Sequence, residues 1–196
     1  MTARVVFLLL LFSGAPTGCL EEPTSLLEGM VTQVNDGDHL EVQLQSGPVT
    51  VRLDSIDAPE LNQPYGAAAK LALSELVARG EIELEVITQD RDEGIIAVVY
   101  SGGINVNEWM VKSGHAWAYR QYLKDTKYCV WEDAARDRKK GLWRLHPDQR
   151  LAPWQWRAGQ RGNLSVPGDL TNETVENCIA AIGEPQSAHL PASSGR

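Results

Sequence analysis

The sequence is poor in several features that define simple classes of protein. Its 196 residues contain 3 cysteines and no internal repeat. The apolar run at residues 5–12 is too short to span a membrane. None of the 6 tryptophans precedes Trp109, so the first half of the chain must build its core from other side chains. A chain of this length holds one domain with a hydrophobic core, together with terminal extensions.

The N-terminus has the pattern of an export signal. Arg4, the apolar run at 5–12 and the small residues after it predict a signal peptide over residues 1–18. Gly-Cys at its end is typical of a bacterial lipoprotein, in which Cys19 becomes the lipidated first residue. Pro16 departs from that pattern, because a leucine is usual there. The sequence thus predicts a periplasmic or extracellular protein, with a lipid anchor at Cys19 or with an ordinary signal peptide as the alternative.

Export changes how the two remaining cysteines are interpreted. In an oxidising compartment Cys129 and Cys178 are expected to form a disulfide. The bond would tie the C-terminal tail to a predicted helix, and closing a loop of this size contributes about 4 kcal/mol in the chain-entropy account. The alternative is a pair of unpaired thiols, with Cys129 buried in its helix.

The net charge of −8 conceals two halves of opposite sign. Residues 28–111 carry 15 acidic and 4 basic side chains, whereas residues 112–161 carry 5 acidic and 12 basic ones. An acidic half that could hold a metal, next to a basic half, suits a polyanion that lies across both. The alternative is a solvated helix surface, which would explain Arg136, Arg138, Lys139 and Lys140 equally well.

Hydrophobic patterning divides the chain into short strands and helices. Strands are predicted at 28–35, 38–45, 48–55, 81–88 and 95–101, and helices at 65–79, 105–112 and 126–140. This organisation predicts a domain over 28–157 and a tail over 158–196, which holds one short helix around 171–182 and ends in about a dozen disordered residues. Most tryptophans are expected to pack helices against the sheet, and residues 153–156 to fold back as a closing clasp. The pattern is compatible with an OB-type barrel but does not by itself select one.

Two acidic motifs carry the functional signal. The first is Asp36-Gly37-Asp38, and the second runs from Arg52 to Glu60 and contains Asp57. Both follow β-type runs, so neighbouring strands can bring Asp38, Asp57 and Glu60 to one rim. Carboxylates without His or Cys suit calcium or magnesium, and the guanidinium of Arg52 suits a phosphate ester. Taken singly, each motif is an ordinary turn sequence.

The ordered series of motifs resembles the staphylococcal-nuclease-like family over residues 28–157. The further pieces are Gln63 to Lys70, Val106 to Ala116, Ala134-Ala135-Arg136, Gly141-Leu142-Trp143 and Pro153 to Arg157. The resemblance implies an α+β, mainly β fold: a five-stranded OB-fold barrel with three helices. It also implies a monomeric, metal-dependent endonuclease that hydrolyses single- or double-stranded DNA or RNA to products with 3′-phosphates.

The resemblance also implies roles for individual residues. Asp38 and Asp57 would ligate calcium, or magnesium as the alternative, and the backbone carbonyl of Ala58 would be a third ligand. Glu60 would orient or deprotonate the attacking water, and Arg52 would bind the phosphate.

The positions next to these residues have weaker assignments. Asp36 is expected to be a turn residue. His39 is expected to be a solvated histidine on the rim, with contact to the site as the alternative. Tyr119 and Tyr122 either line the site or pack against the third helix.

One position departs from the family pattern. The family places a second phosphate-binding arginine just before the fifth strand, where this chain has Gly94 or Ile95. Arg91, a few residues upstream, is the candidate substitute, and losing such a donor commonly lowers a rate about 10²–10³-fold. Weakened activity is therefore expected. Two alternatives stay open: a non-catalytic nucleic-acid-binding module, and a structural or interaction protein of the cell envelope.

Overall fold

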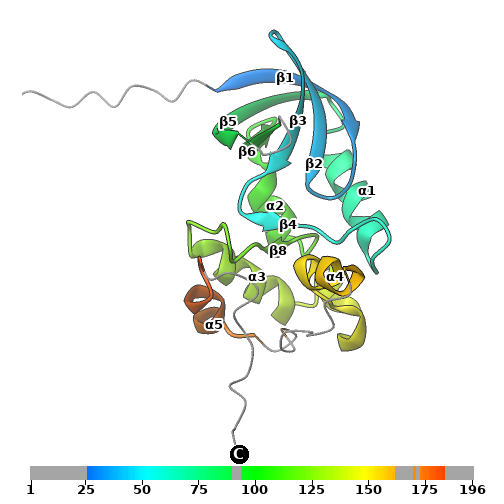
Figure 1. The fold of residues 1–196 in the computed structure, drawn as a ribbon, viewed down its shortest axis with the longest axis vertical. Coiled ribbons are helices and arrows are strands. Elements are labelled where there is room, and N and C mark those ends of the chain that lie inside the picture. The colour runs from blue at the N-terminus through cyan, green and yellow to red at the C-terminus, as the bar shows by residue number, and fades with distance from the viewer. Residues whose placement is uncertain (1–25, 90–93, 162–169, 171–172, 184–196) are drawn as a thin grey trace, which may run out of the picture.

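Five strands form a closed barrel at the top of the molecule (Figure 1). The computed structural model describes residues 26–89, 94–161, 170 and 173–183. The predicted signal peptide, Cys19, Arg91 and the last dozen residues lie outside this part of the chain. β1 pairs with β2 and β5, β2 with β3, β5 with β6, and a parallel β3–β6 pairing closes the barrel. The barrel strands are β1 Leu27–Val34, β2 His39–Leu44, β3 Gly47–Leu53, β5 Glu81–Gln89 and β6 Ile95–Ser101.

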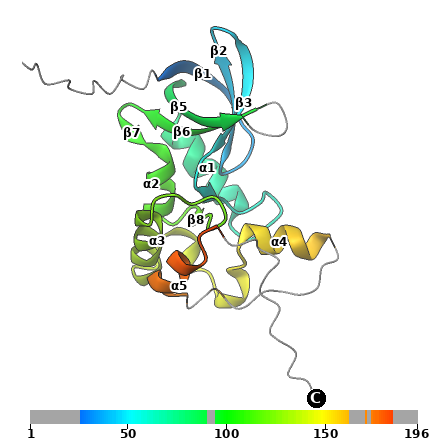
Figure 2. The same ribbon diagram turned by 60° about the vertical axis from the view of Figure 1, so that its left-hand side comes forward.

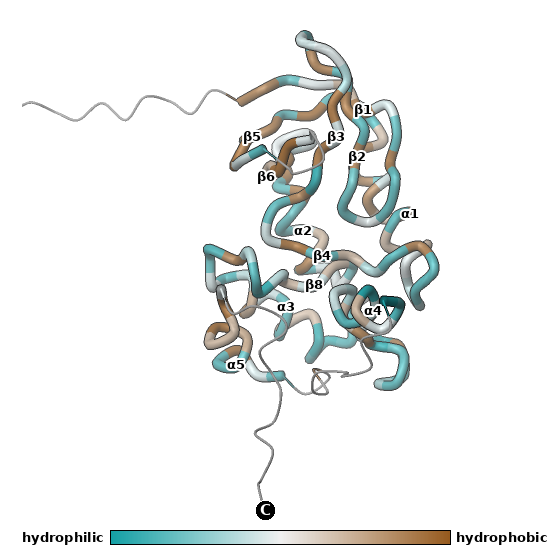
Figure 3. The backbone as a smooth tube through the Cα atoms, in the orientation of Figure 1, coloured by the Kyte–Doolittle hydropathy of each residue, from teal (hydrophilic) through white to brown (hydrophobic). Residues whose placement is uncertain are grey.

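The five predicted strands and the OB-type barrel are therefore confirmed. Alternating side chains face inward, so that Leu40 and Val42 of β2 are buried while their neighbours are not. The same period of two buries Val51 and Leu53 in β3, and Figure 3 shows hydrophobic residues recurring along the strands. The strands contribute only aliphatic side chains to this core, since no tryptophan precedes Trp109, and Trp109 and Trp131 pack against it from the helices.

The helices extend the prediction. α1 Gly66–Leu76, α2 Val106–Lys112 and α3 Lys127–Asp137 are the three expected helices, and α5 Val175–Ala180 is the short helix expected in the tail. The structure adds one helix that was not expected, α4 Pro153–Gln160, where a proline occupies the first turn. Short elements complete the fold: β4 Ile56–Asp57, β7 Ile104–Asn105, β8 Trp117–Ala118, and the 3₁₀ turns η1 Gly141–Arg144 and η2 Pro147–Gln149.

Below the barrel lies a helical layer, defined here as α3, α4, α5, η1 and η2 (Figures 1 and 2). The core between this layer and β8 is aromatic: the indoles of Trp117 of β8 and Trp143 of η1 are fully buried and meet edge to face at 4.6 Å between ring centroids, and Trp154 of α4 contacts Trp117 at 5.9 Å. The predicted disulfide is confirmed, because Cys129 of α3 is bonded to Cys178 of α5. The tail is thus attached to the domain.

A two-stranded ribbon, β4 paired with β8, lies between the barrel and the helical layer. Asp57 of β4 pairs with Trp117 of β8, so an acidic residue of the second motif stands next to the aromatic core. Among the described residues, none of the helices has the length and apolarity needed to cross a membrane.

Candidate active site

Asp38 stands at the end of the turn that leads into β2. The Asp36 carboxylate accepts a hydrogen bond from the Asp38 N–H at 3.0 Å, which is the turn role expected of Asp36. The Asp38 carbonyl accepts from the N–H of Leu53 at 2.9 Å, and its carboxylate Oδ2 accepts from the N–H of Ala58 at 3.0 Å. Asp38 is 3% exposed, and its backbone carbonyl and its carboxylate are both held by N–H groups of the second acidic motif.

Asp57 reaches the same rim from β4. The chain turns sharply at Ser55, a non-glycine residue with a left-handed φ of 65°, before β4 begins. Asp57 is 1% exposed, and its Oδ1 lies 3.9 Å from Nη2 of Arg52. Arg52 is paired across the sheet with His39, next to Asp38. The structure thus brings Asp38, Asp57 and Arg52 together, as the motifs predicted.

The two buried carboxylates differ in their electrostatic environment. Burial opposes the ionisation of Asp38, but the hydrogen bond and charge of His39, with Arg52, lower its pKa to about 2. Burial and the nearby Asp38 charge raise the pKa of Asp57 to about 7, against the opposing effect of arginine partners. Two acids in one dry site therefore ionise unequally, and a bound cation would relieve their repulsion.

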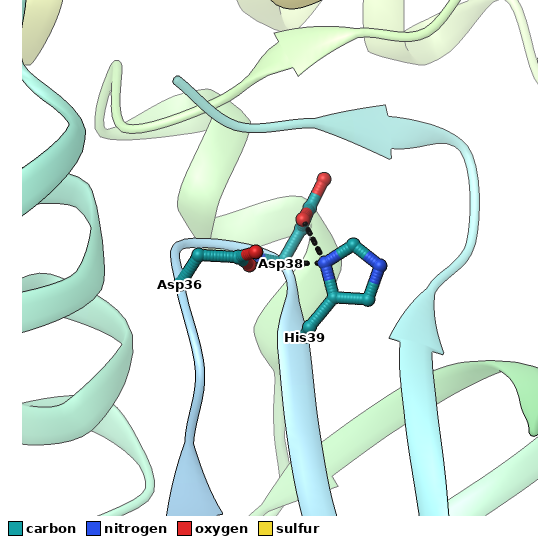
Figure 4. A group of neighbouring side chains, drawn as sticks. All are labelled: Asp36, Asp38 and His39. Atoms are coloured by element: carbon teal, nitrogen blue, oxygen red, sulfur yellow. Dashed lines mark hydrogen bonds and ion pairs between the residues drawn. The ribbon is translucent and has the colours of Figure 1, made fainter. Parts of the chain in front are cut away.

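His39 has a different position from the one expected. Its Nδ1 lies 3.0 Å from Asp36 Oδ1 and 2.8 Å from Asp38 Oδ1, so the ring bridges the two carboxylates (Figure 4). Burial lowers the pKa of His39, but hydrogen bonds to Asp36 and Asp38 outweigh it and raise the pKa to about 10. The prediction of a solvated rim histidine was wrong, because pairing with two acids holds the ring inside the site. These three groups are close enough to hold a cation.

Glu60 lies at the mouth of the site, in the turn before α1. Its side chain is 31% exposed, and its N–H donates to Gln63 Oε1 at 3.2 Å. Its Oε1 accepts from Nη1 of Arg157 at 2.7 Å. Arg157 also forms a bidentate ion pair with Asp57, in which Nη1 lies 2.9 Å from Oδ1 and Nη2 lies 2.7 Å from Oδ2. Glu60 is thus connected to Asp57 through one guanidinium.

Arg157 is a site residue that the motif analysis missed. It belongs to α4 and is separated by about 100 positions in the sequence from both carboxylates that it contacts. The Pro153 to Arg157 segment was noted as a family feature and as a clasp, but nothing local in it indicates which residues it meets. The clasp prediction is confirmed: Trp156 donates from its indole to Asn62 at 3.1 Å, and Trp154 stacks on Tyr119 at 5.5 Å.

The two tyrosines left open by the sequence differ in position. Tyr119 lies between the arginines, with the guanidinium carbon of Arg52 at 5.9 Å and that of Arg157 at 6.0 Å from its ring centroid. It therefore lines the site. Tyr122 touches Tyr119 edge to face at 5.0 Å and is 48% exposed.

Neither of the two positions that align with the second family arginine, Gly94 and Ile95, supplies a side-chain hydrogen-bond donor. Ile95 is the first residue of β6 and its side chain is buried. A Cβ placed on Gly94 would lie 2.7 Å from the carbonyl oxygen of Thr50, so this backbone leaves no room for a side chain there without a shift. The proposed substitute, Arg91, lies outside the described residues.

The donor set suits a hard cation. Two buried carboxylates, the adjoining backbone and water supply oxygen, the ligand atom that calcium and magnesium prefer, whereas Nδ1 of His39 is occupied by its contacts with Asp36 and Asp38. Arg52 stands beside them with a guanidinium fork that matches phosphate oxygens, and Glu60 reaches solvent where a water could be activated. Such a site can bind a phosphodiester and deprotonate an attacking water.

Comparison with known sequences places this geometry in a family. The model of the family described as "Staphylococcal nuclease homologue" matches residues 50–145. An "uncharacterized endonuclease" of Escherichia coli is 39% identical over 132 residues, which cover 67% of this chain and 85% of the relative. A "micrococcal nuclease" of Shigella flexneri is 36% identical over 144 residues, which cover 68% and 82%. The chain belongs to the staphylococcal nuclease homologue family.

The family extends to plants. A "probable staphylococcal-like nuclease" of Oryza sativa subsp. japonica is 38% identical over 111 residues, 57% of this chain. This chain therefore spans less than a quarter of that rice protein, because the match covers 22% of its length.

Proposed function

We propose that the protein is a calcium-dependent endonuclease that hydrolyses the phosphodiester bonds of DNA, RNA or both, with magnesium as the alternative metal. The observation that carries this proposal is the meeting of Asp38, Asp57 and Arg52 at one rim of the barrel. The names of the bacterial relatives, endonuclease and micrococcal nuclease, support the reaction class.

Each residue has a separable task in this mechanism. Asp38, Asp57 and the carbonyl of Ala58 would hold the metal, which when bound polarises a phosphoryl oxygen as a Lewis acid. Arg52 donates to the phosphate and stabilises the charge that builds on it. Glu60 accepts a proton from a water molecule while the oxygen of that water attacks phosphorus. The bond between phosphorus and the leaving 5′ oxygen breaks, and the 5′ oxygen takes a proton from solvent.

The second candidate function is nucleic-acid binding without turnover. It is favoured by the lack of a donor at Gly94 and Ile95, which removes the expected second arginine. On this view the rim still attracts phosphates through Arg52, but hydrolysis is lost. Weak activity and no activity are therefore the outcomes that an experiment has to separate.

Cleavage of single-stranded DNA in calcium, and in chelator, tests the proposal. Glu60→Ala is expected to lower the rate about 10²–10⁴-fold, the usual contribution of a general base. Asp54→Asn is the matched control, because Asp54 belongs to the same motif but its carboxylate bonds to Ser55. Cleavage that persists in chelator, or in Glu60→Ala, would contradict the mechanism; DNA binding without cleavage would select the binding module.

The proposal includes export from the cytoplasm. The Cys129–Cys178 disulfide supports it, because disulfides persist in oxidising compartments. The mass of the mature protein from its host is the test: a chain that begins at a lipidated Cys19 supports a lipoprotein, and a chain that keeps residue 1 contradicts export.

A further inference from the structure

Arg157 lies between Asp57 and Glu60, the two acidic residues for which different roles are proposed. Its Nη1 donates both to Asp57, a proposed metal ligand, at 2.9 Å and to Glu60, the proposed base, at 2.7 Å. Its Nη2 donates to the other oxygen of Asp57 at 2.7 Å. A single guanidinium therefore touches both groups that must surround a reacting phosphate.

The exposure of Arg157 distinguishes it from an arginine that only holds the fold together. Arg120, which follows β8, is 2% exposed and pairs in the interior with Glu132 of α3 and with Glu173. The Arg157 side chain is 27% exposed, the same as that of Arg52. A ligand entering from solvent can therefore reach Arg157, whereas it cannot reach Arg120.

Arg157 and Arg52 converge on one point from different elements. Both approach Oδ1 of Asp57, at 2.9 Å and 3.9 Å, and both lie about equally far from the ring of Tyr119. Arg52 comes from β3 in the barrel, and Arg157 comes from α4 beyond the end of the region matched by the family model at residue 145. Two guanidiniums thus frame the mouth, although the position before β6 supplies none.

We infer that Arg157 is the second phosphate-binding arginine of this site, supplied by α4 in place of a donor at Gly94. Without substrate it rests on Asp57 and Glu60; with substrate its N–H groups donate to the scissile phosphate opposite Arg52. The exchange is chemically matched, because the fork that binds a carboxylate also binds phosphate oxygens. This inference rests on the proposed nuclease function and replaces Arg91 as the donor.

The test compares Arg157→Ala with Arg161→Ala in the full protein. Arg161 directly follows α4, one helical turn after Arg157, is exposed and carries the same charge, so it controls for the general attraction of DNA to a basic surface. Two quantities are measured: cleavage of single-stranded DNA in calcium, and anisotropy of a fluorescent hexathymidylate in chelator, where binding is read without turnover.

Arg157→Ala is expected to lower the cleavage rate about 10²–10³-fold and to weaken hexathymidylate binding about 10-fold or more, while Arg161→Ala changes either by less than about 3-fold. Arg157→Lys keeps the charge but not the fork, and is expected to recover only part of each loss. Arg157→Gln, which keeps a donor for Asp57, repeats the comparison if the alanine variant does not fold, as judged by circular dichroism.

The opposing results are distinct. If Arg157→Ala binds hexathymidylate as tightly as the parent protein, Arg157 acts only on Asp57 and Glu60, and the inference is overturned whatever the cleavage rate of the variant. Cleavage at the parent rate would overturn it as well. Asp38→Asn distinguishes failure of the proposed nuclease mechanism from failure of the role proposed for Arg157. If Asp38→Asn cleaves DNA normally, the nuclease mechanism is wrong. If Asp38→Asn is inactive while Arg157→Ala is active, only the role of Arg157 is wrong.

Discussion

The barrel and the helical layer each bury a core, but the two cores are built from different kinds of side chain. The barrel buries aliphatic residues at every second position of its strands, such as Leu40 and Val51. The helical layer buries tryptophans together with a charged pair, Arg120 and Glu132, and is closed by a disulfide. The first core is built by a repeating local pattern. The second depends on particular partners that are far apart in the sequence.

The site lies where these two regions meet. Asp38 and Arg52 belong to the barrel strands or to their ends, Asp57 to the ribbon between the regions, and Arg157 to the helical layer. The acidic barrel half supplies the carboxylates and the basic half supplies one of the two guanidiniums. A change that loosens the helical layer should therefore affect the site while leaving the barrel folded.

Removing the buried acid of the helical layer should have the largest effect on stability. Glu132 is 2% exposed and accepts from Arg120 at 2.9 and 2.7 Å and from Arg136 at 2.5 Å. Glu132→Ala leaves buried cationic charge uncompensated and should lower the free energy of unfolding by about 3–5 kcal/mol, measured by urea denaturation. Glu108→Gln, in the half-buried i,i+4 pair with Lys112, is the control and should cost about 0.3–0.5 kcal/mol. Equal costs would show that burial does not matter here.

The disulfide should matter nearly as much. Cys129→Ser combined with Cys178→Ser opens a link between residues 49 apart in the sequence and should cost about 4 kcal/mol. Hydrogen exchange measured by mass spectrometry should show protection lost first in α3 and α5. Equal loss in the barrel strands would mean that the two regions are not separable in stability.

Acid should weaken the helical layer in the same direction as Glu132→Ala, but less. Burial opposes the charge of Glu132, yet Arg120 and Arg136 outweigh it and lower the pKa below the ordinary 4.5. A lowered pKa means that its stabilisation is complete above pH 4.5 and is lost as the pH falls through the folded value. Tryptophan fluorescence followed from pH 6 to pH 2 should report this loss, and Glu132→Gln should remove this component. A helical layer that gains stability on acidification would contradict the sign.

The smallest effect should come from the ribbon that joins the regions. Ile56 in β4 is fully buried, and Ile56→Val removes one methylene at a cost of about 0.5–1.5 kcal/mol. Because the two regions are expected to be separable, hydrogen exchange should show unequal losses in β2 and in α3. The same loss in both would mean that the regions unfold as one unit, with no boundary of cooperativity at the β4–β8 ribbon.

The strands and most of the site were predictable because their signals are local. Period-two alternation places Leu40 and Val42 inside, and the acidic motifs follow strands whose ends meet at one rim. His39 was misjudged because its neighbours in the fold, Asp36 and Asp38, determine its burial and its charge together. α4 was missed because its Pro-Trp-Gln-Trp start is too short to show a helical period.

The sequence by itself determined the strands and the acidic motifs, since each is a pattern of residues that lie close together along the chain, and the ordered series of motifs led through the family resemblance to the barrel. Only the tertiary structure decided that Arg157 reaches Asp57 and Glu60, across about 100 residues. The physical reason is that α4 is positioned by its contacts: Trp154 stacks on Tyr119, and Trp156 bonds to Asn62. Partners brought together in this way leave no periodic signal, because only the packing of the helical layer under the barrel makes them neighbours.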